Sequence, residues 1–406
     1  MIGSKWDMIM AGAGMSGRSL ALECARRPAF RDKKILLIDR GEKKQNDRTW
    51  CFWSLPGEPV PPVVYKYWDQ CLFFGEQGVQ PLEIAPYRYA MVRGIDFYEW
   101  TEAEFRQYPN VQSIQAGITG LDIATGTVRT DQGDFQGEWV FNSAFTKERL
   151  LPDAGDLWPT TPFTTADPDK TSDKAFTRLL QHFKGWVIET ATDHFDPAVM
   201  TFMDYRIPQK GETRFAYVLP FSEKKALIEF TVFSEALCAP EEYERELSDY
   251  IGNILNIDRY KILETEFGII PMTDDPFSRR QGRVFHIGTA GGFVKASSGY
   301  AFKRTQRKLR EFADAWEQAS VPDERVFRSP WRFRFYDSVM LRVLRDQAVS
   351  GKAFFSDLFG KLPPQLVFRF LDEDSTFADE LRLLSAPPAW PFFRSALKQI
   401  PVFLKI

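Results

Sequence analysis

The sequence predicts an α/β protein that combines a parallel βαβ unit with antiparallel strands and a helical C-terminal section. Between residues 6 and 39, an apolar run, a glycine-rich turn, a helix-like stretch and a second apolar run follow one another. This order is typical of a βαβ unit with a buried parallel sheet. Two runs with period-two alternation, 213–219 and 226–233, are joined by a short polar segment and predict a β-hairpin. Beyond residue 328 the periodicity becomes helical.

Composition and charge exclude several classes of protein. A chain of 406 residues exceeds the usual size of a single core, so we expect two or more packed lobes. The net charge of −3 provides no general attraction to nucleic acid, which is not expected as a partner. The four cysteines are scattered without a CxxC pair, which argues against a metal site and indicates a reduced, intracellular setting. No oligomeric state is predicted.

Phenylalanine is the compositional outlier, with 36 of 406 residues. This content suits a protein that surrounds a flat apolar ligand, although a phenylalanine-rich core without a ligand explains it equally well. We expect no cleaved signal peptide before the first strand, and no window of the sequence reaches roughly 18 consecutive apolar residues. We therefore expect a cytoplasmic protein whose membrane contact, if any, is peripheral.

The first glycine-rich turn, 12–17, reads GAGMSG and fits the pattern GxGxxG between a strand and a helix. In a dinucleotide-binding unit, Gly12 permits the tight turn, Gly14 lets the backbone approach a pyrophosphate, and Gly17 allows close helix–strand packing. Asp39 ends the second strand, where it would accept a hydrogen bond from a ribose hydroxyl. The spacing alone does not separate FAD from NAD. The candidate cofactor-binding residues in this unit are Gly12, Ala13, Gly14, Met15, Ser16, Gly17 and Asp39.

A second glycine segment, 288–292, follows the apolar run 284–287 and is expected to lead into a helix. Backbone N–H groups at such a turn could approach the rest of a dinucleotide, and two segments so far apart favour FAD. An ordinary glycine-rich strand-to-helix turn is the alternative. Its candidate cofactor-binding residues are Gly288, Gly291 and Gly292. Amphipathic helices are predicted for 241–256 and 305–320.

Three acidic residues are candidates for catalysis. Glu229 lies between apolar neighbours on the alternating run, and a carboxyl desolvated there would have a raised pKa and could act as a general acid. A solvent-facing strand glutamate is the alternative. Asp204 and Glu266 are similar candidates, for which an ion pair or a turn cap is the simpler interpretation. The three histidines show no metal spacing.

The tail, 390–405, interleaves bulky apolar residues with cations. This pattern suits an anchor at a membrane interface. A segment docked on the protein core would show a similar pattern, and the sequence does not decide between the two.

Taken together, these motifs resemble the bacterial flavin-dependent lycopene β-cyclase family, and the resemblance runs nearly end to end. The matching blocks are 12–17, 47–53, 203–206, 227–231, 266–272, 288–300, 335–337 and 370–376. Many flavin hydroxylases carry an acidic residue where this chain has Thr289, which weakens a hydroxylase interpretation.

The resemblance implies a flavin hydroxylase-like fold, in which a Rossmann-type FAD domain is interleaved with an antiparallel sheet that covers the substrate. We expect the FAD domain mainly in 1–60, 80–190 and 265–325, and the covering sheet mainly in 60–80 and 190–265. The remaining residues, 326–406, form the C-terminal helical section. The resemblance also adds Arg48 to the cofactor-binding candidates.

The resemblance further implies a proton-initiated cyclisation of lycopene ends to β-ionone rings without net redox change. Glu229 becomes the preferred general acid, with Asp204 and Glu266 as site residues of unresolved role. Reduced FAD would stabilise the cation, NADPH would supply the reduction, and the enzyme would work at the inner face of the cell membrane. The alternatives are an FAD-dependent oxidoreductase or hydroxylase acting on an isoprenoid or aromatic substrate, and a non-catalytic carotenoid- or flavin-binding protein.

Overall fold

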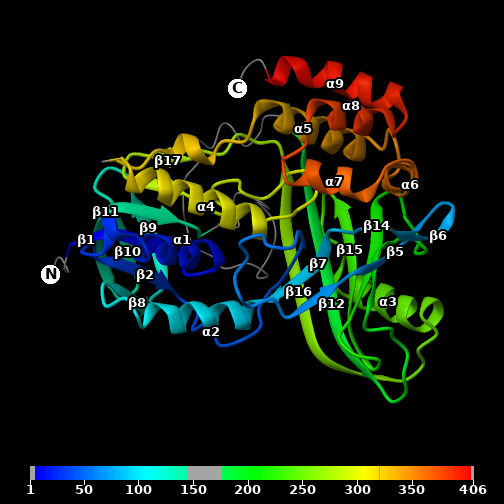
Figure 1. Cartoon of the computed structure of the whole chain (residues 1–406), viewed down its shortest axis with the longest axis horizontal. Coiled ribbons are helices and arrows are strands. Elements are labelled where there is room, and N and C mark those ends of the chain that lie inside the picture. Colours follow the sequence, from blue (N-terminus) through cyan, green and yellow to red (C-terminus); the bar gives the residue numbers. More distant parts are fainter. Residues whose placement is uncertain (1–4, 145–175, 320, 404–406) are drawn as a thin grey trace.

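The computed structural model describes residues 5–144, 176–319 and 321–403. Their strands form three sheets, and the α/β class predicted from the sequence is confirmed. In Figure 1 the N-terminal α/β unit lies at the left, a long antiparallel sheet at the right, and the C-terminal helices along the top.

The first sheet is the one predicted from the βαβ pattern. β1 (Trp6–Ala11) pairs in parallel with β2 (Ile35–Asp39) and with β11 (Gly133–Asn142), and β11 pairs in parallel with β18 (Val284–His286). The sheet is completed by β8 (Val111–Gln115), β9 (Ile118–Asp122), β10 (Thr127–Thr130) and β17 (Arg280–Gln281). β1 and β2 consist almost entirely of buried apolar residues, as strands covered on both faces require.

Helices cover this sheet. α1 (Met15–Ala25) packs beside α4 (Phe302–Glu317), and Gln306 Nε2 donates to Ser19 Oγ between them (2.7 Å). A third helix, α2 (Gly94–Phe105), also contacts α1. Because α4 comes nearly 300 residues after α1, the unit is assembled from both ends of the chain.

The second sheet has seven strands and carries the predicted hairpin, β14 (Thr213–Pro220) with β15 (Lys225–Ser234). Its strand order is β16-β12-β15-β14-β13-β5-β6. The other members are β16 (Tyr260–Thr273), β12 (Arg178–Thr190), β13 (Val199–Asp204), β5 (Gln70–Gly75) and β6 (Gly78–Leu82). A small third sheet joins β3 (Thr49–Ser54), β7 (Arg88–Arg93) and β4 (Lys66–Trp68).

The two faces of the seven-stranded sheet pack against different helices. One face carries Leu227 and Phe233 and packs towards the C-terminal helices. The other face carries Ile228 and Phe230 and is covered by α3 (Pro240–Asp249) and the π-helical turn Tyr250–Ile254. The C-terminal helices are α5 (Trp331–Arg345), α6 (Gly351–Lys361), α7 (Pro364–Leu371), α8 (Phe377–Ser385) and α9 (Ala389–Phe403), which confirms the predicted helical section.

The structure differs from one sequence-based expectation. The resemblance places residues 178–190 and 265–273 mainly in the FAD domain, but they lie in β12 and β16 of the seven-stranded sheet. The boundary between the two domains depends on which strands pair over long sequence distances. Local periodicity contains no information about that pairing. The amphipathic helix predicted for 305–320 is α4, which begins at Phe302, and turns join it to the second glycine segment.

Candidate active site

The first glycine turn has the conformation that the motif predicts. Gly12 has a φ of +106°, in the region that favours glycine, and a Cβ on Gly17 would lie 2.0 Å from the carbonyl oxygen of Gly12. Asp39 Oδ2 accepts a hydrogen bond from the backbone N–H of Ala13 (2.8 Å). Asp39 therefore holds the turn in place from the end of β2.

The second glycine segment meets the first one in space. Gly288 has a φ of +60°, and a Cβ there would lie 2.3 Å from Ser16 Oγ in the first turn of α1. A Cβ on Gly291 would lie 2.1 Å from the carbonyl oxygen of His286. The two segments, separated by most of the chain, thus form one glycine-lined region at the start of α1. A Cβ on Gly14, in contrast, would meet no described atom within 4 Å, so the backbone is open at that glycine.

Glu229 and Glu266 lie in one row across three adjacent strands. Gly185 of β12 is the register partner of Glu229 on β15 and of Glu266 on β16. A Cβ on Gly185 would come within 2.9 Å of Glu266 Cγ and 3.1 Å of Glu266 Oε1. The glycine therefore leaves the space that the Glu266 side chain occupies.

Hydroxyl groups position both carboxyls. Thr231 Oγ1 donates to Glu229 Oε1 and Thr49 Oγ1 donates to Glu266 Oε2, each at 2.7 Å. Among the described residues, no lysine or arginine forms an ion pair with either glutamate. The pair is held by neutral donors and is not neutralised by a neighbouring cation.

Burial raises the pKa of Glu229 well above its usual value, and the negative charge of Glu266 raises it further. Burial also raises the pKa of Glu266, against the hydrogen bond from Thr49, which lowers it. Both side chains are half-buried by the surrounding protein, because the rest of each side chain borders a cavity. Two carboxyls so close in a poorly hydrated space favour retention of one proton between them.

This cavity, which we call the carboxyl cavity, has a volume of about 250 Å³. It lies between the row of glutamates, β3 and the segment that joins β18 to α4. Tyr217 and Tyr300 line it, and burial raises the pKa of both hydroxyls, so they stay protonated. Arg48 is the one cation among the described lining residues, with an exposed guanidinium beside Asp47 (Nε to Oδ2 3.7 Å).

A second, apolar cavity of about 340 Å³ adjoins the carboxyl cavity. Tyr217, Ser298 and Tyr300 line both cavities, so they mark the junction. Most of its wall comes from aromatic and aliphatic side chains of α5 to α9, including Phe335, Leu358 and Phe370. Part of the phenylalanine excess therefore surrounds an apolar space.

Asp204 lies on the opposite face of the same sheet. Its strand partner is Ala216, its side chain is 0% exposed, and it accepts hydrogen bonds from Arg206 Nε (3.0 Å) and the Tyr250 hydroxyl (2.7 Å). The structure therefore brings Glu229 and Glu266 together but separates Asp204 from them. The sequence-based grouping of all three residues in one site does not match this geometry.

The site contains residues that the sequence analysis did not single out. Gly185, Thr49, Tyr217 and Tyr300 shape the carboxyl cavity. An isolated glycine within a strand often marks a close approach, so Gly185 carried a readable signal. Tyr217 is the register partner of Glu229 in the predicted hairpin, and Tyr300 ends the matching block 288–300, so both positions carried a signal that the sequence analysis did not use.

One face of the C-terminal tail is docked on the protein, as one of the two interpretations of the sequence expects, and another face is exposed. Ser395 and Gln399 of α9 are buried, and Phe392 stacks on Phe354 with ring centroids 5.5 Å apart, so one face of the helix is docked. The opposite face of α9, together with α8, exposes large apolar side chains. These residues form the apolar face: Phe377, Leu381, Leu384, Trp390, Phe393, Leu397 and Ile400. Leu384 and Phe393 also line the apolar cavity.

Comparison of the sequence with known proteins identifies the family of this chain. Residues 7–397 match the family described as lycopene cyclase protein. The chain belongs to the lycopene cyclase family. It is an enzyme of that family. A lycopene beta-cyclase from Paracoccus sp. is 22% identical over 97% of both chains. A lycopene beta-cyclase from Pantoea ananas is also 22% identical, over 95% of this chain and 96% of the relative.

Solved structures share the fold of this lycopene cyclase family member at low identity. A geranylgeranyl bacteriochlorophyll reductase-like protein from Thermoplasma acidophilum has a TM-score of 0.57 at 12% identity, covering 99% of this chain and 98% of its own. The flavin-dependent brominase Bmp2 has a TM-score of 0.58 at 12% identity, covering 98% and 100%. The expected flavin-enzyme type of fold is therefore confirmed. Within the described residues, every helix is too short or too polar to span a bilayer.

Proposed function

We propose that this protein cyclises the linear ends of lycopene to β-ionone rings, giving β-carotene by way of γ-carotene, with Glu229 as the general acid. The observation that carries the proposal is the junction of the two cavities. A pair of carboxyls with raised pKa values lines a cavity that adjoins the apolar cavity. A polyene end that enters from the apolar side would reach a proton donor.

In the proposed reaction, protonated Glu229 donates its proton to C2 of the linear end, and a cation forms at C1. The C5=C6 double bond attacks C1 and closes the ring, and loss of a proton from C6 leaves the C5=C6 alkene. One proton enters and one leaves, so the product is an isomer of the substrate. The charge of Glu266 keeps the proton on Glu229 before substrate binds and favours the adjacent cation once it has formed.

The apolar walls would exclude water from the short-lived cation. Tyr217 and Tyr300 place aromatic rings at the junction, and aromatic faces attract positive charge. A cation captured by water would yield an alcohol, so a dry junction supports ring closure over hydration.

FAD fits the glycine-lined region, because the backbone is open at Gly14 and the two glycine segments meet at the start of α1. Gly12, Gly14 and the start of α1 would hold the pyrophosphate, and Gly288 to Gly292 would face the rest of the dinucleotide. Thr289 and Arg48 line the carboxyl cavity, so these two residues would orient the flavin towards it. When bound in the reduced form, FAD would supply electron density that stabilises positive charge, with NADPH as the reductant.

We also propose that the apolar face of α8 and α9 rests on the inner face of the cell membrane. Trp390 is 70% exposed, and Leu384 and Phe393 connect the surface with the apolar cavity. Apolar side chains flanked by cations such as Arg394 and Lys398 suit a lipid interface. Flotation with lipid vesicles should fall for the double variant Trp390→Ser/Phe393→Ser and stay unchanged for Val79→Ser, an equally exposed residue on β6. Equal flotation of all three proteins contradicts this placement.

Expression in lycopene-accumulating cells tests the function as a whole. We expect lycopene to disappear and cyclic carotenes without added oxygen to accumulate, compared with cells that carry an empty vector. The purified protein should consume far fewer moles of NADPH than the moles of rings that it forms. Unchanged lycopene in cells that contain folded, flavin-loaded protein contradicts the proposal, and NADPH consumption in step with product favours an oxidoreductase.

A further inference from the structure

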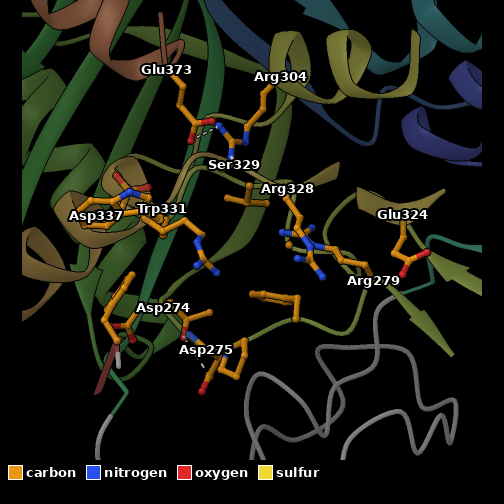
Figure 2. A pocket seen from close by; sticks show the side chains of 18 of the residues that line it. Asp274, Asp275, Arg279, Arg304, Glu324, Arg328, Ser329, Trp331, Asp337 and Glu373 are labelled. Carbon is orange, nitrogen blue, oxygen red and sulfur yellow. Dashed lines mark hydrogen bonds and ion pairs between the residues drawn. The ribbon is translucent and has the colours of Figure 1, made fainter. Parts of the chain in front are cut away.

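A third cavity, lined by arginine side chains, lies apart from the carboxyl pair. It has a volume of about 570 Å³ and is bounded by the end of β16, the loop before β17, and the segment from Arg328 to α5. Figure 2 shows Arg279, Arg304 and Arg328 around the same space, with Glu373 beside Arg304. Arg280 and Arg334 also line this space, which we call the arginine cavity.

The carboxylates that line this cavity are engaged by other groups. Glu373 Oε1 pairs with Arg304 Nη1 (2.7 Å), and Asp337 Oδ2 accepts from Lys295 Nζ (2.9 Å). Asp275 pairs with Arg178 (2.6 Å). Glu324 lies 3.8 Å from Arg280, and Asp274 accepts from the backbone N–H of Thr177 (2.6 Å).

Arg279, Arg328 and Arg334, in contrast, form no ion pair with any carboxylate of residues 5–144, 176–319 and 321–403. Arg279 packs over the ring of Phe293 (5.7 Å), and its Nη1 is buried without a hydrogen-bond partner among the described residues. Burial lowers the pKa of Arg279 to about 10, and the charges of Arg304, Arg334 and Arg328 lower it further. The three cations repel one another, so an anion among them would relieve that repulsion.

We propose that the arginine cavity is a binding site for a phosphate-bearing anion. Guanidinium groups bind phosphoryl oxygens in pairs of parallel hydrogen bonds, and several arginines around one space recur at phosphate sites. The volume suits a small organic phosphate. Trp331, which is 69% exposed at the rim, adds a flat apolar surface for the organic part of such a ligand.

Two sources of phosphate match this chemistry. The 2′-phosphate and pyrophosphate of NADPH are one source, and the headgroup of an anionic phospholipid is the other. The cavity is also lined by Phe403 near the end of α9, so a lipid headgroup could reach it from the apolar face. Both sources require the same arginines, and competition separates them.

Calorimetric titration of the flavin-loaded protein with inorganic pyrophosphate tests the site. We expect saturable binding that weakens at least tenfold in Arg328→Gln/Arg334→Gln. Both side chains are exposed, so this variant should keep its fold and flavin. Arg328→Lys/Arg334→Lys keeps the charge without the paired donors and should lie in between. Arg129→Gln, an exposed arginine on β10, is the matched control and should bind like the unaltered protein.

Competition then identifies the source. Displacement of pyrophosphate by NADPH but not by NADH indicates the dinucleotide phosphate, and displacement by soluble short-chain phosphatidylglycerol indicates a lipid headgroup. The proposal is overturned if pyrophosphate does not bind, or if it binds equally to Arg328→Gln/Arg334→Gln and Arg129→Gln. Either result leaves the proposed cyclisation untouched, because the glutamate pair is not involved.

Discussion

Carboxyl groups on the two faces of the seven-stranded sheet have different hydrogen-bond partners and different burial. On the face towards the C-terminal helices, Glu229 and Glu266 share a cavity, with hydroxyl donors and no paired cation among the described residues. On the face towards α3, Asp204 is enclosed completely and paired with Arg206 and Tyr250. Asp204 is held in place by a guanidinium and a phenol hydroxyl, whereas burial and the charge of Glu266 raise the pKa of Glu229. The comparison therefore separates a candidate proton donor from a structural anchor.

The largest expected effect belongs to Glu229→Gln, which keeps the size of the side chain and removes the transferable proton. Cyclisation should fall by roughly 10²–10⁴-fold, the range in which general acids contribute. Flavin content should be unchanged. The measurement is conversion of lycopene in vesicles by the purified, reduced protein. Glu223→Gln, in the exposed turn of the same hairpin, serves as control, and near-normal activity of Glu229→Gln removes this residue from the mechanism.

The same variant should alter stability as a function of pH. The pKa of Glu229 is raised above its usual value of 4.5 in the folded state. At a pH above 4.5, Glu229 therefore binds more protons in the folded protein than in the unfolded protein. The free energy of unfolding therefore decreases as pH rises from about 4.5 through the raised pKa. Urea titrations at several pH values should show a weaker decrease in Glu229→Gln. Identical pH dependence of both proteins would mean that Glu229 is well solvated.

Glu266→Gln should have an intermediate effect and a distinct pH signature. The negative charge of Glu266 is one cause of the raised pKa of Glu229, so its removal should shift the alkaline fall of cyclisation to lower pH. At neutral pH, we expect a loss of up to about tenfold for each unit by which the pKa of Glu229 falls, because the protonated fraction changes by at most that factor. A pH–rate profile of kcat/KM checks this. An unshifted profile would show that the charge of Glu266 does not affect the proton on Glu229.

Gly185→Ala tests whether the space between the carboxyls matters. The added methyl group would lie 2.9 Å from Glu266 Cγ and 3.0 Å from Leu227 Cδ1, so Glu266 has to move. We expect lower activity and a loss of about 1–3 kcal/mol in the free energy of unfolding, which is typical of overpacking. Gly252→Ala, where nothing lies within 4 Å, is the matched control. Unchanged kinetics in Gly185→Ala would show that the pair tolerates displacement.

Asp204→Asn should have the smallest effect on catalysis and a clear effect on stability. Arg206 and Tyr250 would lose a charged acceptor, which lowers the free energy of unfolding by about 1–3 kcal/mol. Activity per flavin-loaded molecule should stay within about twofold, since a side chain on the far face adds nothing to a general acid. Denaturant unfolding and steady-state kinetics provide the two values. A strong loss of kcat with normal stability would show that Asp204 takes part in catalysis.

The sequence by itself determined the features that depend on neighbouring residues. The strand, glycine turn and helix around Gly12 follow from local hydrophobicity and from backbone angles that only glycine adopts readily. Period-two alternation placed Glu229 on the face of β15 that carries Leu227 and Phe233. Helical periodicity likewise marked most of the C-terminal section.

Only the tertiary structure decided which distant residues meet. Glu229 and Glu266 are neighbours because β12 lies between their strands and has a glycine at the shared register position. The face of Asp204 could not be read from alternation, because Met203, with a φ of +57°, interrupts the register of β13. Strand order and register depend on contacts between segments far apart in the chain, and a local pattern carries no information about those contacts.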